Sequence, residues 1–148
     1  MSANLRIEGE VTNPRSFDGA ALAAADEQVA DIAELVPGKA GAGVWLRALL
    51  EQVRVGADAR FASLVSIDGQ FRISVPLAAL RERAVVVYRL GDGPLPDAKG
   101  GPLRLVIVDA PDCHGGAGYE LDACANVKGL GLVRLTAEPE PEVGHRPH

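Results

Sequence analysis

The middle of the chain places the strongest limit on the fold, because two alternating segments flank a tight-turn signal. Phe61–Ile67 has the composition of a strand, and Asp68-Gly69 favours a two-residue turn. In the following segment, Gln70–Val75, apolar side chains occupy every second position. The pattern predicts an antiparallel β-hairpin with one face in the core, and a helix over residues 61–75 would contradict it.

Other segments predict further strands and a few short helices. Ala84–Tyr88 and Leu103–Val108 are nearly continuous apolar runs, which suit strands buried on both faces. Further strands are expected at Leu5–Ile7, Val29–Leu35 and Leu130–Leu135. Helices are expected at Ser16–Ala25 and at Val44–Val53, the latter with Leu46, Leu49, Leu50 and Val53 on one face. A short helix or a turn is expected at Pro76–Arg83. The fold class is therefore α+β, with strand-rich mixed sheets.

Length and charge narrow the organisation and the function classes. A chain of 148 residues suits one domain, here 1–136, and the Glu-Pro repeats after it predict a disordered tail over 137–148. A net charge of −5 argues against nucleic acid as a partner. No apolar stretch is long enough to cross a bilayer, and the first ten residues do not resemble a signal peptide. A cytoplasmic location is expected.

The glycine-rich loop Pro37–Gly43 is the first candidate for ligand binding. It is not a P-loop, because Ala40 stands where Ser or Thr is needed, and Leu46 breaks the dinucleotide spacing. What remains is Lys39 in a loop that leads to a helix, whose N-terminal amides can hold an anion. A plain connection between two elements is the alternative.

The cysteines and histidines form no self-sufficient catalytic set. Cys113, His114 and Cys124 could hold zinc, the two cysteines could be linked, or they could be unconnected. There is no Gly-x-Ser-x-Gly elbow, and His114 is the only histidine outside the tail. Whether the chain is an enzyme stays open, and catalysis would need a borrowed cofactor.

Several short motifs occur in an order that resembles the molybdopterin-binding domain of the sulfite oxidase family. Each is weak alone, but the ordered set covers most of residues 4–136. It comprises the opening Leu5–Pro14, the hairpin Ser66–Leu77, Gly91–Pro96, Lys99–Arg104 and the final Asn126-Val127-Lys128.

The resemblance implies a set of cofactor-binding residues. Arg104 matches an arginine that holds the pterin, Lys99 replaces a histidine of the family, and Asn126, Val127 and Lys128 match a backbone segment around the cofactor. A pterin phosphate is a dianion, to which arginine can donate two parallel hydrogen bonds.

The resemblance also exposes a departure from the family. Its cysteine ligand to molybdenum should lie in the loop that here reads Leu35–Lys39, which contains no cysteine. A thiolate is a strong soft donor that Leu or Val cannot replace. Molybdopterin is thus a candidate cofactor, whereas molybdenum ligation and oxygen-atom transfer are not expected.

Three functions follow as hypotheses. The first is binding of a pterin or another small anionic ligand beside Pro37–Gly43 and Lys99–Arg104, without normal molybdenum chemistry. The second is an active molybdopterin-dependent oxidoreductase with a non-cysteine ligand, and the third is a cofactor-free interaction module. The first hypothesis predicts that Arg104 lies at the floor of a pocket, near Lys99 or Lys128 and facing Lys39. The alternative is that Arg104 forms a salt bridge to a carboxylate of the chain.

Overall fold

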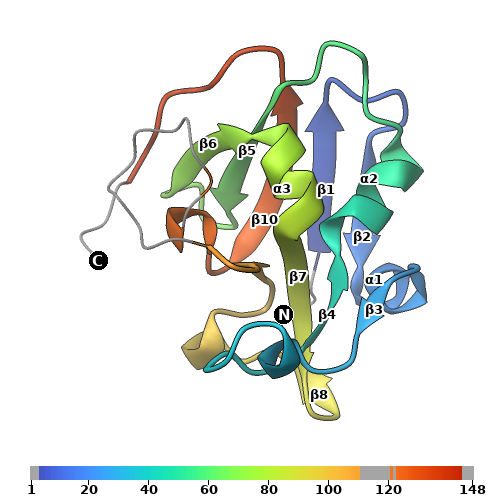
Figure 1. Ribbon diagram of the computed structural model, residues 1–148, viewed down its shortest axis with the longest axis vertical. Helices are drawn as coiled ribbons and strands as arrows, with labels where there is room; N and C mark the ends of the chain where they lie inside the picture. The colour runs from blue at the N-terminus through green and yellow to red at the C-terminus, as the bar shows by residue number, and fades with distance from the viewer. Residues whose placement is uncertain (1–3, 111–120, 122, 145–148) are drawn as a thin grey trace.

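Two β-sheets pack around one main core in the computed structural model, which describes residues 4–110, 121 and 123–144 (Figure 1). The strands are β1 (Asn4–Gly9), β2 (Arg15–Asp18), β3 (Gln28–Val29), β4 (Ala42–Trp45), β5 (Phe61–Ser66), β6 (Arg72–Pro76), β7 (Ala84–Leu90), β8 (Gly93–Pro94), β9 (Arg104–Ile107) and β10 (Leu130–Thr136). The helices are α1 (Gly19–Ala24), α2 (Leu46–Val53) and α3 (Leu77–Arg83), with 3-10 turns η1 (Ile32–Glu34), η2 (Asp97–Lys99) and η3 (Ala123–Ala125).

The first sheet has the order β2-β1-β10-β5-β6 and is mixed. The first and last long strands, β1 and β10, run parallel, while the other neighbours are antiparallel. The predicted hairpin is confirmed, with Phe61 opposite Pro76 and Val65 opposite Arg72. Its turn is held by Asp68, whose carboxylate accepts a 2.9 Å hydrogen bond from the backbone N–H of Gln70.

The second sheet has the order β3-β4-β7-β8, with β9 also paired to β7. Its central strands are buried on both faces, as the apolar runs predicted. Val86 and Leu105 belong to the main core, whereas Val85, Val87 and Val106 form a second cluster on the other face. The sheet therefore needs almost continuous Val and Leu, which is what the sequence supplies.

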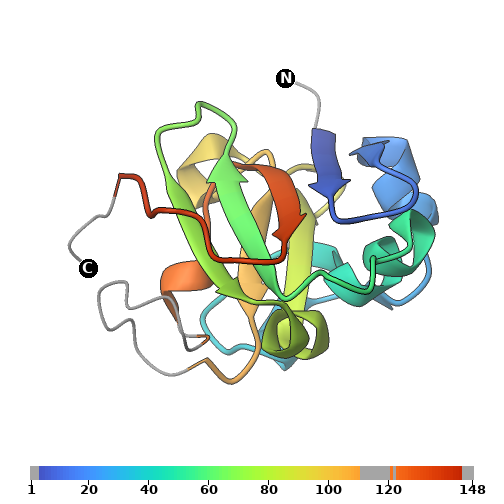
Figure 2. The same cartoon turned by 90° about the horizontal axis from the view of Figure 1, so that it is seen from above.

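Helix α2 confirms the predicted apolar face. Leu46, Leu49, Leu50 and Val53 are all fully buried. The helix contacts β1, β4, β7 and α3, so it packs between the two sheets (Figure 2). It begins at Leu46 rather than at Val44, because residues 42–45 pair with β7 as strand β4.

Two boundaries expected from the sequence are wrong. The segment Ser16–Ala25 is not one helix, since Phe17 pairs with Leu5 in the first sheet and α1 begins only at Gly19. The segment Val29–Leu35 is not one strand, since β3 ends at Val29 and the chain turns into η1. In each case an aspartate ends the strand by capping the turn that follows. The carboxylate of Asp18 accepts a hydrogen bond from Ala21 N, and that of Asp31 accepts one from Ala33 N.

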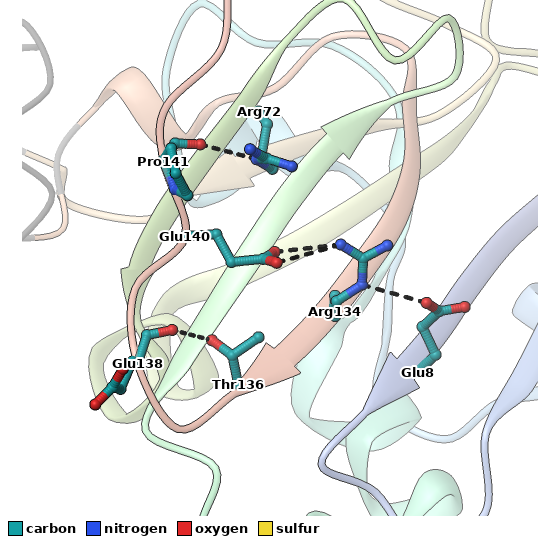
Figure 3. A network of polar contacts seen from close by, with 7 residues as sticks. All are labelled: Glu8, Arg72, Arg134, Thr136, Glu138, Glu140 and Pro141. Carbon is teal, nitrogen blue, oxygen red and sulfur yellow. Dashed lines mark hydrogen bonds and ion pairs between the residues drawn. The ribbon is translucent and has the colours of Figure 1, made fainter.

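The C-terminal segment lies along the edge of the first sheet as far as Gly144 (Figure 3). Val143 and Arg72 exchange two backbone hydrogen bonds of 2.9 Å, and Arg72 Nε donates to Pro141 O at 2.8 Å. The disorder expected from residue 137 onward stays a prediction. The last four residues, 145–148, lie outside the described residues.

An ion pair fastens the same segment to the face of the sheet. Arg134 on β10 lies 3.3 Å from carboxylate oxygens of both Glu140 and Glu8 (Figure 3). The hydroxyl of Ser63, together with Arg134 and Arg72, holds the pKa of Glu140 below its ordinary value, against burial, which raises it. Glu140 is thus held in its charged form.

Candidate anion-binding site

The site is built on β9 and on the chain that precedes β10. Leu105 N donates to Val127 O at 2.9 Å, and Ile107 N donates to the side-chain oxygen of Asn126 at 2.7 Å. Arg104 and Lys128 then form an isolated antiparallel bridge. Asn126 and Val127, which the resemblance offered as cofactor contacts, thus continue the sheet and fix the position of Lys128.

The bridge brings two like charges together. Directly opposite residues of an antiparallel pair extend their side chains on the same face, where like charges are destabilising. Both side chains pass over Gly100, which has a φ of +90°. A Cβ at Gly100 would lie 3.0 Å from Lys128 Cγ and 3.4 Å from Arg104 Cδ, so a larger residue would crowd both cations.

The guanidinium of Arg104 is only partly satisfied. Its Nη1 donates to the carbonyl oxygen of Lys99 at 3.3 Å, while its Nε is buried and has no hydrogen-bond partner among the described residues. Burial lowers the pKa of Arg104. A buried donor without a partner is costly, which is expected where a ligand supplies the acceptor.

Lys39 completes the group of cations. It follows η1 in the loop before β4 and is half-buried. Its pKa is lowered by burial and by the positive charges of Arg104 and Lys128, so its ammonium group lies within their electrostatic range. We call Lys39, Arg104 and Lys128 the basic cluster.

Two further observations define the cluster. Among the described residues, no carboxylate lies within ion-pair distance of any of its members, so the salt bridge considered for Arg104 finds no support there. Lys99 is exposed and contributes its carbonyl group, and no contact places its ammonium with the other three.

Gly100 is a position of the candidate site that the sequence analysis missed. It lies in the motif Lys99–Arg104, but residue types alone do not show that two cations will cross it. Its backbone oxygen accepts from Gly129 N at 2.8 Å, which ties the loop before β9 to the turn before β10. The one hint in the sequence that side chains approach the backbone closely here is the glycine pair Gly100-Gly101.

The described residues do not offer a metal centre. Within 4–110, 121 and 123–144, no three His, Cys, Asp or Glu side chains are grouped to hold an ion. Cys124 is buried and disulfide-bonded, while Cys113 and His114, considered with it as zinc ligands, lie outside the described residues. Among the residues that the structure describes, therefore, no thiol is free to ligate molybdenum.

Comparison with known families identifies the class of protein to which this fold belongs, a cofactor-binding domain of oxidoreductases. The chain matches the family described as "oxidoreductase molybdopterin binding domain" over residues 40–115, and it belongs to that family. Lys99 and Arg104 fall within the matched range, and Lys39 and Lys128 fall outside it.

A solved structure shows the same fold over most of the chain. It is the sulfane dehydrogenase SoxCD from Paracoccus pantotrophus, with a TM-score of 0.65 and 17% sequence identity. The match covers 92% of this chain but only 38% of the SoxCD chain. No curated protein matches the sequence. Among the described helices, none has the length and apolar character to cross a membrane.

Proposed function

We propose that the chain binds the anionic end of a pterin, or another small anionic ligand, at the basic cluster. The observation that carries this proposal is the bridge between Arg104 and Lys128, at the end of the sheet where the Lys39 loop enters β4, with no carboxylate of the described residues within ion-pair distance. Three converging cations repel one another, and an anion among them removes that repulsion.

The donors suit a phosphate group. Nη1 of Arg104 is directed to Lys99 O, which leaves the Nε edge of the guanidinium without a described acceptor. A phosphate can accept side-on from that edge while the two lysine ammonium groups neutralise its second charge. In a pterin cofactor the phosphate is the dianionic end, so this arrangement supports the pterin as the first candidate ligand.

We propose further that the chain does not perform thiolate-ligated molybdenum chemistry. When molybdenum is present, it supplies the oxygen-atom transfer typical of the sulfite oxidase family. The loop Leu35–Lys39 carries no cysteine, and the buried Cys124 is already disulfide-bonded. The chain's own part is therefore to bind and orient an anion.

Metal and pterin analysis of freshly purified protein tests the proposal. Pterin fluorescence without molybdenum is the expected result. Molybdenum near one per chain would instead favour the oxidoreductase with a non-cysteine ligand. Absence of both, together with no binding of added inorganic phosphate, would favour the cofactor-free interaction module.

The binding partner and the cellular compartment of the chain are also proposals. A small anionic ligand is the partner proposed here, with neither nucleic acid nor membrane involved. A cytoplasmic location follows from the sequence only. The disulfide of Cys124 argues against it, because reducing compartments rarely preserve such bonds.

A further inference from the structure

The chain uses lysine almost nowhere except at this site. It contains three lysines and twelve arginines, and the three lysines are Lys39, Lys99 and Lys128. Two of them belong to the basic cluster, and the third lends its carbonyl oxygen to Arg104. A positive charge alone does not require lysine at these positions, since arginine supplies the positive side chains in the rest of the chain. A primary amine can do what a guanidinium cannot, because it can lose its proton and form a covalent bond.

Of the three lysines, Lys39 has the surroundings of a reactive amine. It is half-buried, whereas Lys99 and Lys128 are exposed. Burial and the charges of Arg104 and Lys128 lower its pKa, so more of it is uncharged at neutral pH. Desolvation and a neighbouring cation are the two means by which proteins activate lysine as a nucleophile.

We infer that Lys39 captures small anionic carbonyl compounds as an imine, with Arg104 and Lys128 binding the anionic group. The inference rests on the proposed anion site and extends it to a class of ligand, of which a phosphorylated aldehyde is the simplest example. Arg104 and Lys128 lie side by side over Gly100, so one anion can contact both. Val87 of β7 pairs with Gly43 of β4 on one side and with Arg104 of β9 on the other, so the loop that carries Lys39 enters the sheet at the same end as Arg104.

The chemical step is balanced without any further reagent. The lone pair of the uncharged Nζ of Lys39 adds to the carbonyl carbon, and the carbon–oxygen bonds break. The oxygen leaves as water with the two protons of the amine, and a carbon–nitrogen double bond remains. No oxidant or reductant takes part, and water reverses the reaction.

Reductive trapping tests the inference. The whole protein is treated with a small excess of pyridoxal 5′-phosphate, reduced with borohydride, and digested for mass spectrometry. The three lysines can each be assigned to a separate peptide, and Lys99 serves as an exposed reference in the same molecule. We expect Lys39 to be labelled at least about tenfold more than Lys99, because a phosphate group held by Arg104 and Lys128 raises the local concentration of the aldehyde at Lys39.

Three controls separate the causes. With pyridoxal, which lacks the phosphate, most of the preference for Lys39 should be lost. Arg104→Ala should remove the preference for Lys39. Lys39→Arg keeps the charge but has no amine that can form an imine, so it should lose the label at this position while Lys99 is labelled as before.

The failure of this inference can be told from the failure of the proposed function. Equal labelling of Lys39 and Lys99 in a protein that binds inorganic phosphate would overturn the inference and leave the anion site standing. A preference for Lys39 that is equally large with pyridoxal and unchanged in Arg104→Ala would overturn the role of the anion. Loss of both phosphate binding and preferential labelling would overturn both proposals.

Discussion

Arg104 and Lys128 face each other across an antiparallel bridge, although both side chains carry a positive charge. In a structural sheet edge, selection for stability would place an opposite charge at one of these positions. Lys39 adds a third positive charge that interacts with this pair. No carboxylate of the described residues lies within ion-pair distance of the three side chains. Under the proposed function, this arrangement lowers the stability of the free protein and provides a place where an anion can bind.

The first prediction concerns this repulsion. Lys128→Glu places a carboxylate opposite Arg104, and it should raise the free energy of unfolding by about 0.5–1 kcal/mol, as favourable cross-strand charges do. The same variant should lose phosphate binding. Urea denaturation and calorimetry measure the two effects. Lys99→Glu, which makes the same charge change outside the cluster, should alter stability by less than about 0.5 kcal/mol; a clearly destabilised Lys128→Glu protein would contradict the account.

The second prediction concerns the glycine beneath the two cations. Gly100 and Gly91 both have positive φ angles, +90° and +61°, but only at Gly100 would a Cβ meet other atoms. Gly91→Ala should therefore cost only the backbone strain, about 1 kcal/mol. Gly100→Ala should cost on the order of 1 kcal/mol more, because Lys128 and Arg104 must move. Equal losses in urea denaturation would show that the side chains are not fixed there, and only Gly100→Ala should weaken phosphate binding.

The third prediction concerns pH and the C-terminal segment. The pKa of Glu140 is lowered in the folded protein, so its contribution to stability is present above the pKa of the unfolded chain. It is lost as the pH falls below about 4.3, the ordinary value for glutamate, and through the lower folded value. Glu140→Gln should therefore reduce stability at pH 7 but much less at pH 3. A difference that does not change with pH, measured by denaturation at both values, would rule out the ionic contribution.

The fourth prediction concerns the thiols. Because Cys124 is disulfide-bonded, thiol counting under denaturing, non-reducing conditions should find no free thiol. Reduction should lower the free energy of unfolding by on the order of 2–3 kcal/mol, the chain-entropy value for a short closed loop. Two free thiols per chain in protein handled in air would refute the disulfide.

The sequence predicted the elements whose signal is local. The hairpin around Asp68-Gly69 and the buried face of α2 follow from spacing within a few residues, and both are confirmed. Strand β4 was missed because residues 42–45 are short and contain glycine, so that only pairing with β7 makes them a strand. The same holds for Phe17, whose place in β2 depends on its partner Leu5.

The candidate site divides in the same way. Arg104 and Lys128 could be named from ordered motifs, and the sequence also drew attention to Lys39 in its glycine-rich loop. Two features of the site depend on tertiary contacts. The side-chain oxygen of Asn126 accepts a hydrogen bond from Ile107 N, and Lys99 lies apart from the basic cluster. No pattern within one segment contains that information.

Calorimetric titration with inorganic phosphate tests the central claim most directly, because it asks for the anion site without assuming the ligand. We expect saturable phosphate binding that weakens with added salt, because the charges of the site are only partly buried. Arg104→Ala should weaken it at least about tenfold, the value of one charge-assisted hydrogen bond. Arg6→Ala, which removes an exposed charge from β1, should leave it unchanged. Phosphate binding that is absent, or equal in Arg104→Ala and the unaltered protein, would contradict the account.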